Sequence, residues 1–365
     1  MTPLRQTGRA GLEFLGSLQS YASRGLRAKA RDEFYATPEM AELGDEPLGP
    51  RPTDEMRSLI ARARDVAERS HHWRYERFYQ RFVAENVYER GIPATEDQRE
   101  PIEQMLTVLA EGANEKALTL DPDLREPGYF EQVEWHLMPG GWDGYDLSGP
   151  MFMLGIGPMI FSRGGYAAVA PGEDIAEQRR QVVAELQPGP YRRILDVGCG
   201  GISTIAVLRS AFPEAEITGI DLSANTLRFA HLMAEKLGLN VHLKQADLTH
   251  TKEPDNHYDA VTAYAVFHEM DDPSAARAVA ELFRVLAPGG SLLISDPGPA
   301  RGCTPWEAVL YDWETENREE PWFTDAMLRD LPELLDRAGF VEIREYPLGT
   351  GAYPWIIRAC KPGAA

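Results

Sequence analysis

The stretch "ILDVGCGGISTI", residues 194–205, passes from apolar residues into three glycines within four positions. Ile194, Leu195 and Val197 predict a buried strand, and the residues from Ile202 onward predict a helix. Glycines between a strand and a helix let the backbone approach a ligand closely, and the helix start offers free N–H groups. By itself, such a turn is compatible with many kinds of nucleotide-binding protein.

A second strand is predicted at "EITGIDLS" (216–223), and it ends at Asp221, 25 residues after Asp196. An acid at the tip of this strand is placed to accept hydrogen bonds from both hydroxyls of a ribose. From residue 172 onward, strand-like runs alternate with amphipathic helices, which predicts a doubly wound α/β sheet. Three further strands are predicted at "VHLKQADL" (241–248), "YDAVTAYAVFHEM" (258–270) and "SLLISDP" (291–297).

Five stretches in this order resemble the class I S-adenosylmethionine-dependent methyltransferases: "LDVGCGG", "ITGIDLS", "QADL", "YDAVTAYAVFHEMDD" and "FRVLAPGGSLLISDP". The resemblance spans roughly 175–361 and implies a Rossmann-like α/β sheet of seven strands that ends in an antiparallel hairpin. "GFVEIREYPL" and "YPWIIRACK" would supply that hairpin. One departure is that the family's third glycine often stands where this chain has Ile202, and here it is displaced to Gly201. A glycine turn in an unrelated α/β protein is the alternative.

The resemblance implies S-adenosylmethionine as the cofactor and assigns roles to the residues that match. The glycine turn would make room for the methionine part, and Asp196 would reach the cofactor's amino group directly or through water. Asp221 would bind the ribose, and Asp247 could face an adenine edge. The full set predicted to bind the cofactor is Asp196, Gly198, Cys199, Gly200, Asp221, Leu222, Ala246, Asp247, Leu248 and Tyr264.

A sulfonium methyl group is already activated, so the enzyme must align the acceptor and dispose of its proton. Histidine is the usual base for a hydroxyl acceptor, and His268 follows the fourth predicted strand in "VFHEMDD". The stretch is similar to "LHDW-D" in plant phenolic and bacterial polyketide O-methyltransferases, whose histidine is the base; here Met270 replaces Trp and Glu269 replaces Asp. A helix-capping or core histidine is the alternative.

In the lid-region loop "YDWETEN", Asp312 and Glu314 are further base candidates, unless they belong to a solvated acidic loop. The predicted catalytic set is His268, Glu269 and Asp312.

An aromatic and methionine-rich segment, 134–166, lies immediately before the predicted cofactor domain and could line an acceptor pocket or the core of the helical region. The predicted acceptor-binding residues are Trp142, Tyr145, Met153, Tyr166 and Phe267. The spacings typical of zinc sites are absent, and we predict no metal. O-methylation of a small molecule is favoured. The alternatives are S-methylation of a thioether or thiol, C-methylation of a quinone-like ring, and a cofactor-binding protein that transfers no methyl group.

Composition limits the partners. The formal net charge of −20 argues against nucleic acid as the main partner, and 43% hydrophobic residues allow a sizeable core. Three widely spaced cysteines do not make a disulfide framework, so we expect a cytoplasmic protein. No apolar run reaches the roughly 18 residues of a membrane-spanning helix.

Three regions are predicted along the chain. Residues 1–53 form a helix and a linker, because 36–53 hold four prolines and two glycines. Residues 54–171 form a helical region that covers the substrate and pairs two subunits, as in the dimeric enzymes that the chain resembles. Residues 172–365 form the cofactor domain. The first 31 residues carry six Lys or Arg against one acid, as in a transit peptide or membrane-surface helix, but we favour a helix that docks on its own acidic protein or on a second subunit.

Overall fold

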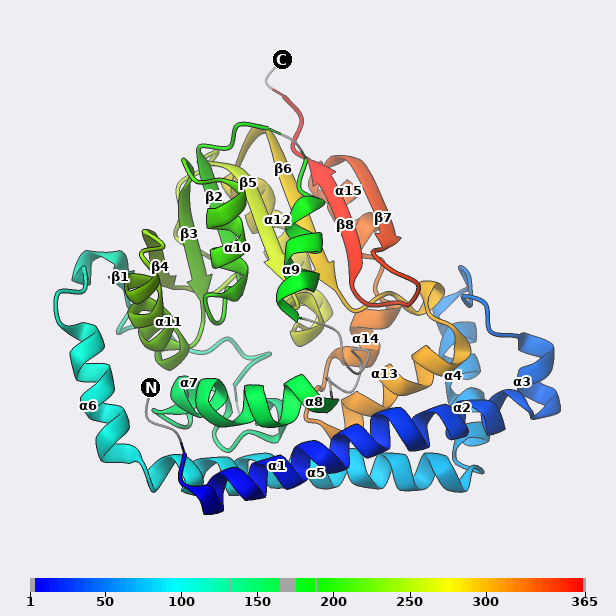
Figure 1. Cartoon of the computed structure of the whole chain (residues 1–365). Coiled ribbons are helices and arrows are strands. Elements are labelled where there is room, and N and C mark those ends of the chain that lie inside the picture. The colour runs from blue at the N-terminus through cyan, green and yellow to red at the C-terminus, as the bar shows by residue number, and fades with distance from the viewer. Residues whose placement is uncertain (1–3, 132, 165–174, 188, 364–365) are drawn as a thin grey trace.

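An eight-stranded sheet carries the C-terminal half of the chain (Figure 1). The computed structural model describes residues 4–131, 133–164, 175–187 and 189–363. The strand order is β1-β4-β3-β2-β5-β6-β8-β7, in which β8 runs antiparallel to both β6 and β7 and all other neighbours are parallel. The strands are β1 Leu118–Thr119, β2 Arg193–Val197, β3 Glu216–Asp221, β4 Val241–Gln245, β5 Tyr258–Tyr264, β6 Leu286–Asp296, β7 Val341–Pro347 and β8 Trp355–Cys360.

The seven predicted strands and the antiparallel hairpin are therefore confirmed as β2 to β8. The eighth strand, β1, was not predicted because it is only two residues long and comes from the helical region. It pairs with β4 through Leu118 opposite Leu243. The N-terminal region thus contributes a strand to the sheet.

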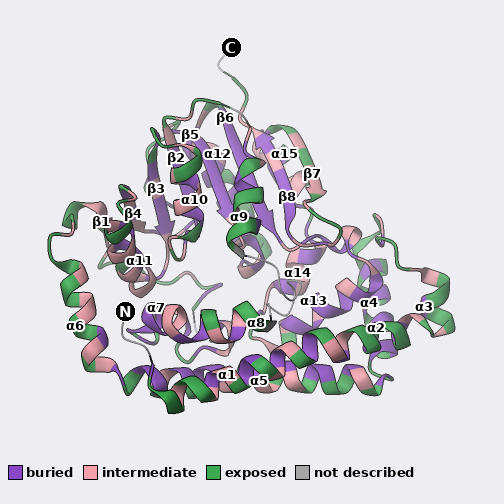
Figure 2. Cartoon of the chain, viewed as in Figure 1, coloured by how far each residue is buried: buried purple, intermediate pink, exposed green. Residues whose placement is uncertain are grey.

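Helices cover both faces of the sheet (Figure 1). Along β2, Ile194 packs with α9, α10 and α11, whereas Leu195 packs with α12 and α15, as the two-residue period of a strand requires. Figure 2 shows that most of the central strands are buried between these layers. The helices are α9 Ile175–Ala184, α10 Ser203–Ala211, α11 Ala224–Leu237, α12 Asp272–Val285 and α15 Leu331–Ala338.

The N-terminal helices lie beneath the carboxyl edge of the sheet (Figure 1). Helix α1 continues through a π-helical turn into α2, and it packs along α5 in the opposite direction, with Gly8 against Ala94 and Ser23 bonded to Gln80. Leu12 and Leu15 of α1 are fully buried, whereas Phe14 is exposed. The elements are α1 Gln6–Tyr21, the turn Ala22–Leu26, α2 Arg27–Tyr35, α3 Pro38–Leu43, α4 Thr53–Ala67, α5 His71–Glu96 and α6 Arg99–Ala110.

Two expectations about loops are wrong. The segment predicted as a linker, 36–53, contains α3, and the stretch "YDWETEN" belongs to α13 Pro305–Asn317. The side chain of Thr304 caps α13 and exchanges hydrogen bonds with Glu307, a capping box that starts the helix at Pro305. The expected domain boundary near residue 171 lies outside the described residues.

Helix α13 and α14 Phe323–Leu328 form an insertion between β6 and α15, and α13 packs on α4. Its tryptophans share a core with the N-terminal helices: Trp306 contacts the rings of Phe34 and Trp73, each at 5.3 Å between centroids. The two halves of the chain therefore share a hydrophobic core.

Segment 112–164 connects α6 to the sheet region. It contains β1, then single 3-10 turns at Glu115–Ala117, Trp135–Leu137 and Gly141–Asp143, and then α7 Ser148–Met151, a π-helical stretch Phe152–Phe161, and α8 Ser162–Gly164. Tyr129, Phe130 and Trp135 join the core on the α12 face of the sheet. None of the helices within the described ranges is long and apolar enough to cross a membrane.

Replacing Trp306 by alanine should destabilise the protein by about 3–5 kcal/mol, because the change empties a buried contact between α2, α5 and α13. Chemical denaturation followed by circular dichroism measures this. The control is Leu237→Ala on the exposed end of α11, which should change the free energy of unfolding by less than about 0.5 kcal/mol. Equal stability of the two variants would contradict the shared core.

Candidate active site

In the glycine turn after β2, the position of Gly198 has a backbone conformation and a close neighbour that exclude any other residue. Gly198 has a φ of +60°, and a Cβ atom there would lie 2.5 Å from Cγ2 of Val266. At Gly200 (φ +50°) and Gly201, an added Cβ would meet nothing within 4 Å. The turn therefore has open space beside it, as a ligand cradle requires.

Asp196 offers a buried carboxylate oxygen beside this turn. Its Oδ1 accepts a hydrogen bond from the Thr262 hydroxyl at 2.7 Å, but its Oδ2 is buried with no partner in the described part of the chain. Burial raises the pKa of Asp196 to about 7. A buried carboxylate oxygen without a donor is unfavourable, and a ligand ammonium group would satisfy it. The site thus fits the amino group of S-adenosylmethionine.

Asp221 at the end of β3 joins the glycine turn to the start of α11. Its Oδ2 accepts from the Gly200 N–H at 2.8 Å, and its Oδ1 accepts from the Ser223 N–H at 2.9 Å. Burial raises the pKa of Asp221 to about 6. Each oxygen keeps a further lone pair, so two ribose hydroxyls could donate to this carboxylate.

The other predicted cofactor residues have varied surroundings. The Asp247 carboxylate accepts from the N–H and the hydroxyl of Thr249, at 2.8 and 2.7 Å, so it is used within its own turn. Cys199 and Leu248 are buried in the cores on opposite faces of the sheet. The Ala246 N–H donates a hydrogen bond to the Asp221 carbonyl at 3.0 Å, and Leu222 is half-buried. The Arg179 guanidinium lies over the Tyr264 ring, 4.9 Å from its centroid.

His268 lies at the carboxyl end of β5 in the 3-10 turn Phe267–Glu269, and Asp296 fixes its ring. Its Nδ1 donates to Asp296 Oδ1 at 2.6 Å, while Asp296 Oδ2 accepts from the N–H groups of Val266 and Phe267. In the described part of the chain, the Nε2 atom of His268 makes no hydrogen bond. Burial lowers the pKa of His268, but Asp296, with help from two glutamates, outweighs it and raises the pKa to about 9.

The two glutamates that help to raise this pKa, Glu320 and Glu269, also contact a second histidine, His136. Glu320 Oε1 lies 2.7 Å from Nδ1 of His136, and Glu269 Oε1 lies 3.6 Å from Nε2 of the same ring. Trp142 meets His136 edge to face at 5.3 Å. The structure thus brings the predicted residues Glu269 and Trp142 together with His136.

Asp296, His136 and Glu320 were missed by the sequence analysis. Asp296 could have been found, since it ends the strand "SLLISD" beside the strand that carries His268. The other two come from segments far from "VFHEMDD" in the sequence, and no local pattern marks them.

Asp312 is not brought together with His268. It accepts hydrogen bonds from Arg64 and from the Thr324 hydroxyl, both at 3.0 Å, in a hollow between α4 and α13. Glu314 is buried rather than part of a solvated loop, and burial raises its pKa. Its Oε1 lies 3.9 Å from a guanidinium nitrogen of Arg77.

Among the predicted acceptor-binding residues, the Tyr145 hydroxyl donates to Glu96 at 2.7 Å, and its ring is buried in the helical core. Met153 is half-buried in the π-helical stretch, and Phe267 is buried beside His268. Tyr166 lies outside the described residues.

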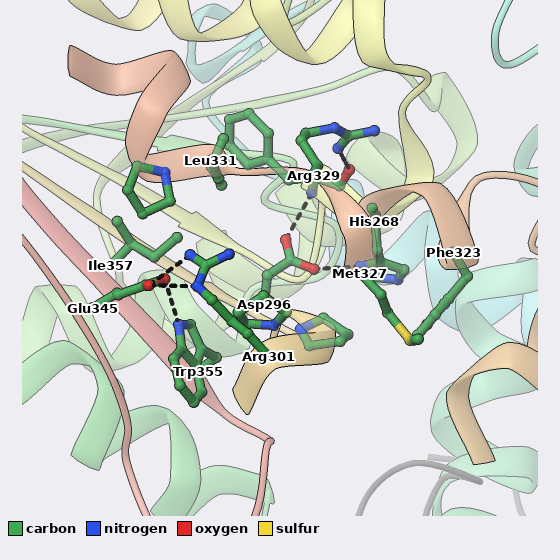
Figure 3. A pocket seen from close by; sticks show the side chains of 15 residues that line it. His268, Asp296, Arg301, Phe323, Met327, Arg329, Leu331, Glu345, Trp355 and Ile357 are labelled. Carbon is green, nitrogen blue, oxygen red and sulfur yellow. Dashed lines mark hydrogen bonds and ion pairs between the residues drawn. The ribbon is translucent and has the colours of Figure 1, made fainter. Parts of the chain in front are cut away.

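A small cavity lies against the His268–Asp296 pair (Figure 3). Its volume is about 30 Å³, enough for one or two water molecules. Its wall includes Phe323, Met327, Arg301, Glu345 and Trp355. Within the described ranges, no group of three His, Cys, Asp or Glu side chains is arranged to hold a metal ion.

A family described as "Methyltransferase domain" matches residues 194–290, from β2 into β6. Demethylmenaquinone methyltransferase of Thermus thermophilus is 37% identical over 133 residues, which are 36% of this chain and 59% of that protein. Ubiquinone biosynthesis O-methyltransferase of Alkalilimnicola ehrlichii is 36% identical over 127 residues, 34% of this chain and 50% of that protein. The chain thus spans less than two thirds of these relatives.

Among solved structures, phosphoethanolamine N-methyltransferase 2 of Haemonchus contortus, with phosphomonomethylethanolamine and S-adenosylhomocysteine, is similar to this chain. The TM-score is 0.46 at 18% identity, and the match covers 61% of this chain and 60% of that one.

Replacing Asp221 by alanine should weaken the binding of S-adenosylhomocysteine by about 2 kcal/mol or more, because two ribose hydroxyls lose a charged acceptor. Isothermal titration calorimetry measures this. Asp255→Ala, which removes a carboxylate exposed in the loop before β5, is the matched control and should keep wild-type affinity. Wild-type affinity in the Asp221 variant would refute the role of β3.

Three observations agree on the class of this site. The glycine turn is open, Asp196 has an unpartnered buried oxygen, and Asp221 stands at the tip of the neighbouring strand. The match to the methyltransferase family covers the segment that carries all three. The chain therefore contains a class I S-adenosylmethionine-dependent methyltransferase domain, with S-adenosylmethionine as its cofactor.

Proposed function

We propose that the protein methylates a hydroxyl oxygen of a small molecule, with His268 as the base. The observation that carries this proposal is the His268–Asp296 pair, whose histidine leaves Nε2 without a hydrogen bond in the described part of the chain. When bound, S-adenosylmethionine supplies an activated methyl group. The base removes the proton that a hydroxyl must lose as the oxygen–carbon bond forms.

The surrounding chain prepares His268 for this task. Two backbone N–H groups hold the Asp296 carboxylate. In the neutral form of His268, this carboxylate keeps the ring proton on Nδ1 and so leaves the lone pair on Nε2. After the hydroxyl proton reaches Nε2, the imidazolium is stabilised by Asp296, Glu320 and Glu269, the same charges that raise its pKa. The site can therefore accept the proton without immediate help from solvent.

The relatives leave the acceptor atom open. Two are named as O-methyltransferases, the ubiquinone biosynthesis enzyme of Alkalilimnicola ehrlichii and the fatty-acid enzyme of Mycolicibacterium smegmatis. Others, such as phosphoethanolamine N-methyltransferase 1 of Arabidopsis thaliana, are named for nitrogen. A thioether acceptor has no proton to lose and would leave a base unused. The buried and oriented base thus favours a hydroxyl.

The test is a methyl-transfer screen with labelled cofactor across phenols, carboxylates, thioethers and quinones. We expect turnover with hydroxyl acceptors, and stoichiometric S-adenosylhomocysteine. Turnover confined to thioethers, or cofactor binding without any S-adenosylhomocysteine, would refute the proposal.

His268→Ala should lower turnover by about 10²–10⁴-fold with little change in cofactor affinity. The base works only when deprotonated, and its pKa is about 9, so wild-type turnover should rise as the pH rises through about 9. In Asp296→Asn the charge that holds the proton is lost, so the rising limb should move to lower pH, toward the ordinary histidine value of about 6.5 or below it. A pH profile of steady-state turnover measures both effects. Profiles that coincide in all three proteins would make His268 a structural residue.

We also propose that two copies pair through α5. Its outward face exposes Tyr75 and Phe78, and Phe82 stacks on Phe78 with 6.3 Å between ring centroids. Among the exposed charges of this helix, Arg74 and Arg81 precede Glu85 and Glu89, so antiparallel copies would place Arg74 near Glu89 of the other copy. Arg81 is already paired with Glu85 in its own chain.

Light scattering tests this pairing. We expect a dimer mass for the wild type and a monomer mass for Phe78→Glu, because a charge in the centre of an apolar interface is not solvated. Val108→Glu on α6, also an exposed apolar residue, should stay dimeric. A wild-type monomer would refute the pairing.

A further inference from the structure

The N-terminal region contributes a histidine, His136, that has no role in the proton transfer proposed above. His136 lies between two carboxylates from the other half of the chain, Glu320 at 2.7 Å from Nδ1 and Glu269 at 3.6 Å from Nε2. A carboxylate can only accept hydrogen bonds when it is ionised, so each ring nitrogen that faces one carries a proton. Burial lowers the pKa of His136, but the two glutamates outweigh it and raise the pKa to about 10.

The two nitrogens of His136 are not equally engaged. The bond from Nδ1 to Glu320 is short, whereas 3.6 Å from Nε2 to Glu269 is too long for a hydrogen bond. The side chain is 28% exposed, while that of Glu320 is only 5% exposed. Glu320 thus anchors the ring, and the Nε2 proton remains available to a ligand.

The backbone holds His136 in a conformation that side chains rarely adopt. Its φ is +57° and that of Leu137 is +64°, both in the left-handed region. Hydrogen bonds to Glu134 keep the turn in place: the Leu137 N–H donates to its carbonyl at 2.7 Å and the Gly140 N–H to its carboxylate at 3.1 Å. Such strain persists only where the surrounding structure fixes it, and it gathers at functional sites.

His136 also lies between the cofactor residues and the base. Trp142, whose ring meets His136, has its carbonyl 3.4 Å from the hydroxyl of Ser223, next to the ribose-binding end of β3. On the other side, the charge of Glu320 acts on both His136 and His268. Glu269 and Glu320 therefore act on the two histidines together.

We propose that His136 is an acceptor-binding residue, whose Nε2–H donates a hydrogen bond to an oxygen atom of the methyl acceptor while His268 takes the proton of the reacting hydroxyl. This inference rests on the proposed O-methylation and narrows it to acceptors that present an oxygen lone pair to the N-terminal region. An ammonium group offers no lone pair, and sulfur is a weak acceptor. The N-terminal region would thus help to select the acceptor.

The experiment compares His136→Ala, His136→Gln and a matched control, His72→Ala. His72 is also paired with a glutamate, Glu33 at 2.5 Å, but it lies in the first turn of α5 and faces α2. The probes are catechol as the oxygen acceptor and thiophenol as the sulfur acceptor. The affinity for S-adenosylhomocysteine and the melting temperature are measured for each variant.

For His136→Ala we expect the KM for catechol to rise about 10- to 100-fold, because one charged hydrogen bond is lost, with a much smaller change in kcat. Glutamine keeps an N–H donor and should recover part of this loss. The KM for thiophenol and all values for His72→Ala should stay near wild type. A wild-type KM for catechol in His136→Ala, or equal losses for catechol and thiophenol, would overturn the proposal. If His136→Ala loses stability, the same comparison is made with His136→Gln.

Failure of the proposed O-methylation is distinguishable from failure of this inference. A wild type that methylates neither catechol nor any other hydroxyl refutes O-methylation. Calorimetric titration of catechol into the complex with S-adenosylhomocysteine then decides the role of His136 without turnover. Binding by the wild type that is weakened in His136→Ala supports the inference. Equal binding by both proteins, or binding by neither, overturns it.

Discussion

One carboxylate, that of Asp143, joins the N-terminal region to the cofactor half of the structure. It accepts hydrogen bonds from the Ser223 hydroxyl at 2.7 Å and from the N–H groups of Ala224 and Asn225 at 3.1 and 2.9 Å. A carboxylate at the start of a helix satisfies free N–H groups and interacts favourably with the helix dipole. Because the Ser223 N–H also donates to Asp221, the covering segment and the ribose-binding acid depend on the same turn. Trp142 directly precedes Asp143 in the chain, so this contact also helps to place Trp142.

The parts of the fold that could be predicted are those with local signals. A buried strand followed by Gly198 and Gly200 can be recognised from neighbouring residues alone, and Asp221 follows from the spacing of two strands. The contacts of Asp296 depend on two strands lying side by side, and those of His136 and Glu320 join segments almost 200 residues apart in the sequence. Asp312 was predicted as catalytic from its local sequence, but the structure pairs it with Arg64, a distant residue that the local sequence does not indicate.

The charges that hold the site together also limit its base. Because the pKa of His268 is raised from 6.5 to about 9, its ion pairs stabilise the folded protein fully below about pH 6.5, and this contribution is lost as the pH rises through about 9. The proton-accepting form of His268 is therefore scarce where the fold gains most from the charged form. The ion pairs that fix the geometry of His268 thus lower the fraction of this residue that is deprotonated and able to act as a base.

The shared core of α2, α5 and α13 has a consequence for biosynthesis. The chain is made from its N-terminus, so Phe34 and Trp73 leave the ribosome long before their partner Trp306 has been translated. During that interval the early helices lack the part of their aromatic core that α13 supplies. Completion of the helical region must wait for the late insertion, and such non-local contacts slow folding. The nascent protein should therefore depend on chaperones until translation has passed α13.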